Sequence, residues 1–250
     1  MTEQIKIDFE KTIKTLDLSK DDVKLKKKFL DRFIEKGFPS RKLENWKFSD
    51  INQIIQKNIG QLSFFNDYSS SNKIDTSIYI DRLDHNKIVF TNGRVEKIDF
   101  SHEDKNKIEI SEILKFEDKI KNDNSLIDLN NAFTNKGYKI LIKKDYNLKK
   151  PLIIYHSTNS KIKSKNINIR LEFQLEQNSS LRLIDYFNHT SEKNFINIFY
   201  NFDLKKDSIL KNYKIDKNQN KNVGYSFNNI NQDENSISEN FILSSGSNFF

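Results

Sequence analysis

The sequence predicts a mainly β protein with a helical N-terminal region, and three observations carry that prediction. Apolar residues recur at helical spacing through about the first 60 residues. From about residue 78, apolar and polar residues alternate, which is the period of a β-strand. The strand-like segments then repeat at a spacing of about 12–16 residues, as in an array of short strands and turns. They begin near residues 138, 151, 167, 181, 195, 209, 223 and 236.

The clearest helix is expected to begin after Ser19. Ser19 and Asp22 have the spacing of a capping box, in which the two side chains satisfy free amides of the first turn. Gly37 and then Pro39 are expected to end the helix. The run Lys26–Lys28 is expected to form a solvated face beside the apolar stripe. That stripe consists of Val23, Leu30, Phe33 and Ile34.

A dense motif, GFPSRKLENWKFSDINQII, follows at residues 37–55. Its glycine and proline indicate a tight turn, and Ser49 is expected to cap a short helix that carries Ile51, Ile54 and Ile55. The serine-rich stretch within residues 60–77 is typical of a loop or a domain boundary. These features define a helical N-terminal domain over residues 1–77.

Residues 78–137 are expected to form a mixed α/β connecting region. The segments 78–83 and 87–98 read as strands, and Asn92-Gly93 inside the second is a strong signal for a β-hairpin. A helical interlude is expected over about 111–134.

Residues 138–250 are expected to form the β core. Alternation is strict over 167–175, so one face of that strand should be buried and the other solvated. A sandwich, an up-and-down barrel or a β-solenoid would all produce this repeat, and periodicity alone does not choose between them. The pattern continues into the final FILSSGSNFF without a capping segment. A solenoid of this kind would be truncated at its C-terminal end, or would need another chain to cover that end.

The amino-acid composition argues against several classes of protein. The 250 residues include 20 Phe and 9 Tyr, which supply core material that disordered chains lack. The net charge of +7 raises the possibility of a nucleic-acid partner. Arginine is scarce, however, and 35 acidic residues are interspersed among the basic ones, so we expect no nucleic-acid binding. The chain has no cysteine, which excludes disulfides and thiolate metal sites. We expect a cytoplasmic protein without a signal peptide, a membrane span or a membrane partner.

Several motifs together resemble the SufD family, part of the SufB/SufD family of iron–sulfur cluster assembly proteins. GFPSRKLENWKFSDI, within residues 37–55, is similar to the family's N-terminal signature. IVFTNGRV (88–95) and LNNAFTNKGYKILIKKDYNLKKPLIIYH (129–156) resemble later family elements in the same order, and SSGS (244–247) resembles a strand near the middle of the family's β-helix. The resemblance covers nearly all of this chain but only the N-terminal part of a typical member.

The resemblance implies a helical domain followed by a right-handed parallel β-helix (solenoid). It further implies a non-catalytic scaffold subunit that acts with a SufB-like paralogue and a SufC-like ATPase, within a complex that handles the iron–sulfur cluster. The family's C-terminal helices, and a histidine late in its β-helix, have no counterpart before Phe250. Docking of the SufC-like ATPase is therefore doubtful for this chain. SufB itself is a poorer match because it usually carries cysteines.

Side chains capable of chemistry do not form a recognisable site in the sequence. We therefore expect no catalytic residue, no cofactor-binding residue, no metal ligand and no tightly bound cofactor. The histidines, His85, His102, His156 and His189, show no ligand spacing. Glu103-Asp104 and Glu117-Asp118 are adjacent in sequence and should point in different directions, unlike a glycosidase pair. The chain contains neither a P-loop motif nor a G-x-S-x-G motif, and SSGS is better read as a strand end.

The most distinctive cluster is Arg41, Glu44 and Trp46. Its members could form a docking surface, because Trp and Arg are frequent interface anchors. Alternatively, Trp46 staples the N-terminal domain to its neighbour while Arg41 pairs with Glu44, and this second interpretation is preferred. Two other functions remain as alternatives to the scaffold: a β-helix polysaccharide-active enzyme and a basic nucleic-acid-binding protein.

Overall fold

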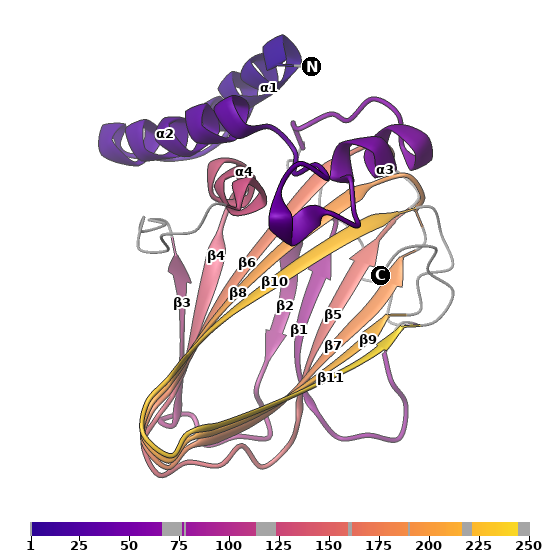
Figure 1. The fold of residues 1–250 in the computed structure, drawn as a ribbon. Helices are drawn as coiled ribbons and strands as arrows, with labels where there is room; N and C mark the ends of the chain where they lie inside the picture. Colours follow the sequence, from indigo (N-terminus) through magenta and orange to yellow (C-terminus); the bar gives the residue numbers. More distant parts are fainter. Residues whose placement is uncertain are drawn as a thin grey trace.

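A computed structural model describes residues 2–66, 77, 79–113, 124–159, 162–189, 191–216 and 222–244. Two sheets of mostly parallel strands face each other, and helices lie across one end of them (Figure 1). The helices are α1 (Thr2–Lys14), α2 (Lys20–Lys36), the 3-10 turn η1 (Glu44–Trp46), α3 (Ile51–Asn58) and α4 (Ser125–Phe133).

The chain alternates between the two sheets as it winds into a parallel β-solenoid. One sheet has the order β11-β9-β7-β5-β1-β2 and the other the order β10-β8-β6-β4-β3. The first strands are β1 (Asn86–Thr91), β2 (Arg94–Asp99), β3 (Ile108–Ile113), β4 (Gly137–Ile142) and β5 (Leu152–Thr158). Three successive coils follow: β6 (Asn166–Leu175) with β7 (Ser180–His189), β8 (Phe195–Leu204) with β9 (Ile209–Asp216), and β10 (Val223–Gln232) with β11 (Ile237–Ser244).

Neighbouring strands are parallel except at the start of the solenoid, where β2 pairs antiparallel with β1 and β3 pairs antiparallel with β4. The predicted fold class, mainly β with a helical N-terminal region and a parallel β-solenoid, is therefore confirmed. A closed barrel and an antiparallel sandwich are excluded, because the later strands add in parallel to two separate sheets.

The bend between the two sheets repeats with the same backbone conformation in every coil. The bends that lead from β4 to β5, β6 to β7, β8 to β9 and β10 to β11 each contain a residue with a positive φ that is Asp or Asn, and these residues tolerate that region better than most other side chains. These residues are Asp145, Asn178, Asp207 and Asn235, with φ of 57°, 58°, 59° and 56°. Amides of the first three donate to the carbonyls of Gln177, Lys206 and Glu234 in the next coil. The stack is thus hydrogen-bonded through its corners as well as its strands.

Apolar side chains from both sheets fill the space between them. Leu152, Leu183, Leu171 and Phe173 are buried there, and Phe173 stacks on Phe202 of the next coil at a centroid distance of 5.1 Å. This inward face is the one that strict alternation over 167–175 predicts.

Helix α2 begins and ends where the sequence predicts. Ser19 Oγ accepts the amide of Asp22 and donates to its carboxylate, and the Gly37 amide donates to the Phe33 carbonyl. The prediction for the lysine run was wrong at Lys26. Lys27 and Lys28 are exposed, but Lys26 is only 2% exposed, because it falls on the same face as Phe29 and Phe33.

The hairpin prediction is confirmed: Asn92 and Gly93 have φ of 54° and 83° between β1 and β2. The predicted cap of α3 was wrong by one residue, because the Asp50 carboxylate rather than Ser49 accepts the Gln53 amide, at 2.9 Å. Of the helix predicted over about 111–134, the described part shows strand to Ile113 and helix only from Ser125. The segment between lies outside the described residues.

Candidate docking surface at the open end of the solenoid

The two ends of the solenoid differ in the strands that form their edges. At the first end, β2 (RVEKID) and β3 (IEISEI) carry several charged side chains. At the other end, β10 (VGYSFNNINQ) has no charged residue and β11 (ISENFILS) has one. Charges on an edge strand discourage another strand from pairing with it. The end formed by β10 and β11, which we call the open end, therefore lacks that protection.

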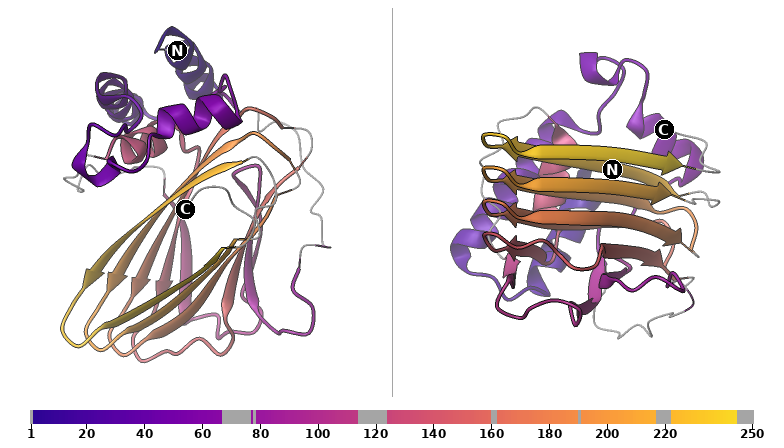
Figure 2. Two further views of the ribbon diagram at one scale, coloured as in Figure 1. Left: turned by 45° about the vertical axis from the view of Figure 1, so that its right-hand side comes forward. Right: turned by 90° about the horizontal axis from the view of Figure 1, so that it is seen from below.

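The open end exposes apolar side chains and strand backbone together. Ile237, Phe241, Ile242 and Leu243 of β11 are 47%, 56%, 57% and 51% exposed. Among the described strands none pairs with the outer edge of β10 or β11, which form the outermost layer (Figure 2). An edge of this kind can accept a further strand, because unpaired amides and carbonyls accompany an apolar surface. Phe249 and Phe250, also expected at an exposed end, lie outside the described residues.

Acidic side chains line the rim of the open end. Each forms an ion pair with a lysine of the preceding coil. The distances from Nζ to the carboxylate oxygen are 3.6 Å for Lys205 and Asp233, 2.8 Å for Lys206 and Glu234, and 3.1 Å for Lys211 and Glu239. Sequence reasoning missed these pairs. The signal was available in their common separation of 28 residues, which equals that of the stacked pairs Asn201–Asn229 and Asn212–Asn240.

The motif at residues 37–55 lies beside the open end. Trp46 packs on Tyr225 of β10 at a centroid distance of 5.6 Å, and Asn124 hydrogen-bonds to the Tyr225 hydroxyl. In the view from below in Figure 2, the segment with η1 and α3 reaches past the outermost strands. On this segment Phe48 is 86% exposed and lies under Lys47 Nζ at 5.0 Å.

The cluster of Arg41, Glu44 and Trp46 is thus split by the structure. Trp46 is half-buried and acts as the predicted staple between the N-terminal region and the β core. The predicted pair of Arg41 with Glu44 was wrong. Both side chains are exposed, and Glu44 lies 3.9 Å from Lys47, one turn along the same segment.

The histidines occupy unrelated surroundings. His102 is exposed in a turn, and the side chain of His189 lies outside what the structure describes. His85 is buried, with Nδ1 at 2.5 Å from the Leu83 carbonyl and Nε2 at 2.8 Å from the Tyr155 hydroxyl. Burial lowers the pKa of His85, so this imidazole is neutral and donates from Nδ1 to the carbonyl.

His156 belongs to a polar contact inside the solenoid. Its Nε2 lies 3.0 Å from Asp185 Oδ1 and 2.9 Å from the Tyr200 hydroxyl, which donates to Asp185 at 2.6 Å. The imidazole stacks on Phe187 at 4.5 Å. Burial, reinforced by the Asp185 carboxylate, raises the pKa of Tyr200 well above its ordinary value. His156 is 1% and Asp185 3% exposed, so the cluster is closed to solvent, and its hydrogen bonds link β5 and β7 to β8.

Glu103 and Asp104 point in different directions, as expected. Glu103 is buried and accepts hydrogen bonds from the Asn86 amide group and the Tyr146 hydroxyl, both at 2.7 Å. Asp104 is exposed and pairs with Lys149 at 2.6 Å. Burial opposes ionisation of Glu103, but its hydrogen bonds outweigh that effect, and its pKa is lowered. The pair Glu117-Asp118 and most of SSGS lie outside the described residues.

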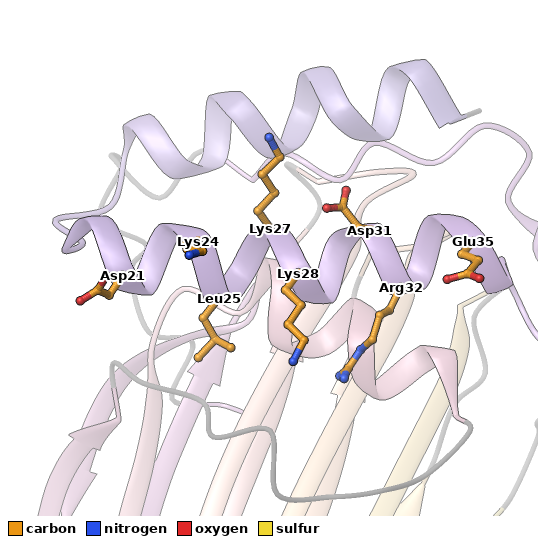
Figure 3. Close-up of a pocket in the computed structure, with 8 residues that line it drawn as sticks. All are labelled: Asp21, Lys24, Leu25, Lys27, Lys28, Asp31, Arg32 and Glu35. Carbon is orange, nitrogen blue, oxygen red and sulfur yellow. The ribbon is translucent and has the colours of Figure 1, made fainter.

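A shallow hollow of about 610 Å³ runs along α2. Figure 3 shows that its lining side chains leave the helix in different directions: Lys27 and Asp31 point toward α1, whereas Lys28 and Arg32 point toward α4. Arg32 forms an ion pair with Asp128 of α4. Basic and acidic groups are mixed along the hollow and do not converge on one point, so it does not have the form of a ligand site.

Comparison with known proteins does not assign the chain to a family. No protein-family model matches the sequence, and no curated protein matches it significantly. Within the described ranges, no group of three or more His, Cys, Asp or Glu side chains is placed to hold a metal ion. The described helices are too short or too polar to cross a membrane.

Proposed function

We propose that this protein is a non-catalytic scaffold subunit that joins its partners through the open end of the β-solenoid. The observation that carries the proposal is the pair of edge strands β10 and β11, almost free of charge and bearing the exposed side chains of Phe241, Ile242 and Leu243. Such an edge offers both backbone hydrogen bonds and apolar area to a partner strand.

The partners proposed are a SufB-like paralogue and, through it, a SufC-like ATPase, in a cytoplasmic complex that assembles iron–sulfur clusters. Support comes from the resemblance of residues 37–55, 88–95 and 129–156 to the SufD family. In the structure the signature within 37–55 packs beside the open end, since Trp46 rests on Tyr225. On this proposal the cluster is cargo of the assembled complex.

Co-purification tests the proposal. The chain is expressed with a tag beside the SufB-like and SufC-like proteins of the same cell, and eluates are analysed by mass spectrometry. We expect the SufB-like protein to co-elute with the wild-type chain and to be lost with the double variant Phe241→Lys, Leu243→Lys. A matched control, Ile7→Lys, changes an apolar residue of similar exposure on α1 and should leave co-elution unchanged. Absence of the SufB-like protein from the wild-type eluate would contradict the proposal.

A further inference from the structure

Charged side chains form columns that run across the coils. The amides of Glu176, Lys205 and Asp233 donate to the carbonyls of Ile142, Leu175 and Leu204, which places residues 143, 176, 205 and 233 one above another. In order, these residues are Lys143, Glu176, Lys205 and Asp233, so the sign of the charge alternates along the column. Lys205 forms an ion pair with Asp233 of the next coil at 3.6 Å, and opposite charges at neighbouring positions of this kind favour stacking.

The column ends on a carboxylate at the open end, and two neighbouring positions end in the same way. Asp233, Glu234 and Glu239 are contacted from beneath by lysines, and their side chains remain 52%, 68% and 57% exposed. Asp233 contributes to the electrostatic surroundings of Lys205. The pKa of this lysine is raised, first by the hydrogen bond to Asp203 and additionally by the charge of Asp233. A carboxylate contacted on one side only can accept a second cation from the other side.

Aromatic side chains also stack from coil to coil up to the open end. Phe227 of β10 stacks on Phe199 of β8 at a centroid distance of 5.8 Å and an interplanar angle of 15°. The Arg170 guanidinium of β6 lies 4.6 Å from the centroid of the Phe199 ring. The register continues the same way in β6, β8 and β10, where Arg170, Phe199 and Phe227 are successive partners. Phe227 is half-buried at the end of this column.

We propose that the open end binds a β-coil of a partner chain that adds in parallel to β10 and β11 and places Lys or Arg above Asp233, Glu234 and Glu239. This inference rests on the proposed scaffold function and specifies the chemistry of the partner. The partner is recognised by three basic side chains at the spacing of Lys205, Lys206 and Lys211, with two in the bend between two strands and one on the second strand. Apolar contact supplies area, whereas the rim charges select the partner and set its register.

The chain itself supplies a probe. The segment FINIFYNFDLKKDSILKNYKID, residues 195–216, is the coil that already lies against β10 and β11 and carries Lys205, Lys206 and Lys211 at the required spacing. A fluorescent peptide with this sequence should bind the intact protein, and binding should weaken with rising salt, because exposed charges are screened. The matched control peptide replaces all three lysines with glutamate and should bind about tenfold more weakly.

Charge-reversal variants of the protein test the same contacts from the other side. Asp233→Lys, Glu234→Lys, Glu239→Lys should invert the preference and bind the glutamate peptide more tightly. Because this variant also sets lysine against lysine within the fold, the milder Asp233→Asn, Glu234→Gln, Glu239→Gln is measured beside it and should bind both peptides equally. Circular dichroism checks that each variant is folded.

Equal affinity of the wild-type protein for both peptides, or binding to neither, would overturn the inference. A dimer of the protein alone that the lysine peptide does not displace in sedimentation velocity would also overturn it, in favour of a second copy as occupant. The two hypotheses can fail separately. If a SufB-like partner co-purifies and its binding does not depend on the rim charges, the proposed scaffold function is supported and the inference of a basic partner coil is rejected. If peptide binding depends on charge but no SufB-like protein co-purifies, the preference of the open end for a basic coil is supported and the proposed scaffold function is contradicted.

Discussion

Lys26 shows how a single residue can join two parts of the protein. Its Nζ donates to the carbonyls of Asn131 and Thr134 at 3.1 and 2.8 Å and lies 3.5 Å from that of Ala132, at the C-terminal end of α4. These carbonyls lack partners within their own helix and carry the negative end of its dipole. The lysine therefore fastens α2 to α4.

Burial, together with the positive charge of Arg170, lowers the pKa of Lys26 from 10.5 to about 7. Between these two values the unfolded chain holds a proton that the folded chain has released. The free energy of unfolding should therefore rise with pH across this window, by up to about 1.4 kcal/mol per pH unit from this group. The neutral amine keeps two N–H donors, enough for the two shorter hydrogen bonds.

Lys26→Met removes this titration and keeps the length of the side chain. We expect the difference in unfolding free energy between wild type and variant to change in favour of the wild type as pH rises from about 7 to 10. Urea unfolding at several pH values measures it. Lys27→Met, exposed on the same helix, is the control and should follow the wild-type slope. Equal slopes for wild type and Lys26→Met would contradict the lowered pKa.

At the scale of the secondary-structure element, the bends between strands depend on a backbone conformation rather than on a buried side chain. Asp207 has φ of 59°, and its amide donates to the Glu234 carbonyl of the next coil at 3.0 Å. Positive φ crowds Cβ against the backbone, and β-branched residues tolerate it least. The repeated Asp or Asn at this corner follows from that restriction.

Asp207→Gly and Asp207→Val separate conformation from side-chain chemistry. The glycine variant should change the unfolding free energy by less than about 1 kcal/mol, since glycine adopts positive φ freely. The valine variant should destabilise by about 1–2 kcal/mol. Thermal and urea unfolding measure both. Similar losses in the two variants would mean that the Asp207 carboxylate, and not the backbone conformation, stabilises the bend.

At the scale of the whole molecule, the solenoid is asymmetric. Antiparallel strands β2 and β3 with charged side chains end it on one side, and the nearly uncharged β10 and β11 form the other edge. Helices α2 and α4 do not change this asymmetry, because they lie across the ends of the strands and not over β11 (Figure 1).

Self-association should follow from this asymmetry when no partner is present. We expect the mean mass from light scattering to rise with protein concentration, because exposed strand edges with apolar side chains pair with other chains. Phe241→Lys with Leu243→Lys should lower the mass at each concentration, and Ile7→Lys should not. A wild-type protein that stays monomeric at high concentration would mean that the open end does not associate by itself.

The sequence alone predicted most of the fold because its two periods differ clearly. Apolar residues at helical spacing predicted α2, and the capping box at Ser19 and the turn at Gly37 predicted its two ends. The spacing of strand-like segments predicted the starts of eight strands of the solenoid to within about two residues. Asn92-Gly93 gave the hairpin, because positive φ at both positions favours these residues. The cap of α3 was less certain in sequence, since Ser49 and Asp50 are both good caps and only the backbone path selects Asp50.

The sequence by itself thus determined the local conformations and the apolar inward face, which depend on neighbours a few residues away. Tertiary structure decided the rest. It chose a solenoid over a barrel or a sandwich, because only the parallel pairing of β8 with β6 and β10, across 29 and 28 residues, distinguishes these folds. It buried Lys26 at the end of α4, drew His156 and Asp185 to Tyr200, and set three carboxylates on the rim of the open end. Each of these depends on contacts between distant segments, and periodicity within one segment carries no information about which distant strand will lie beside it.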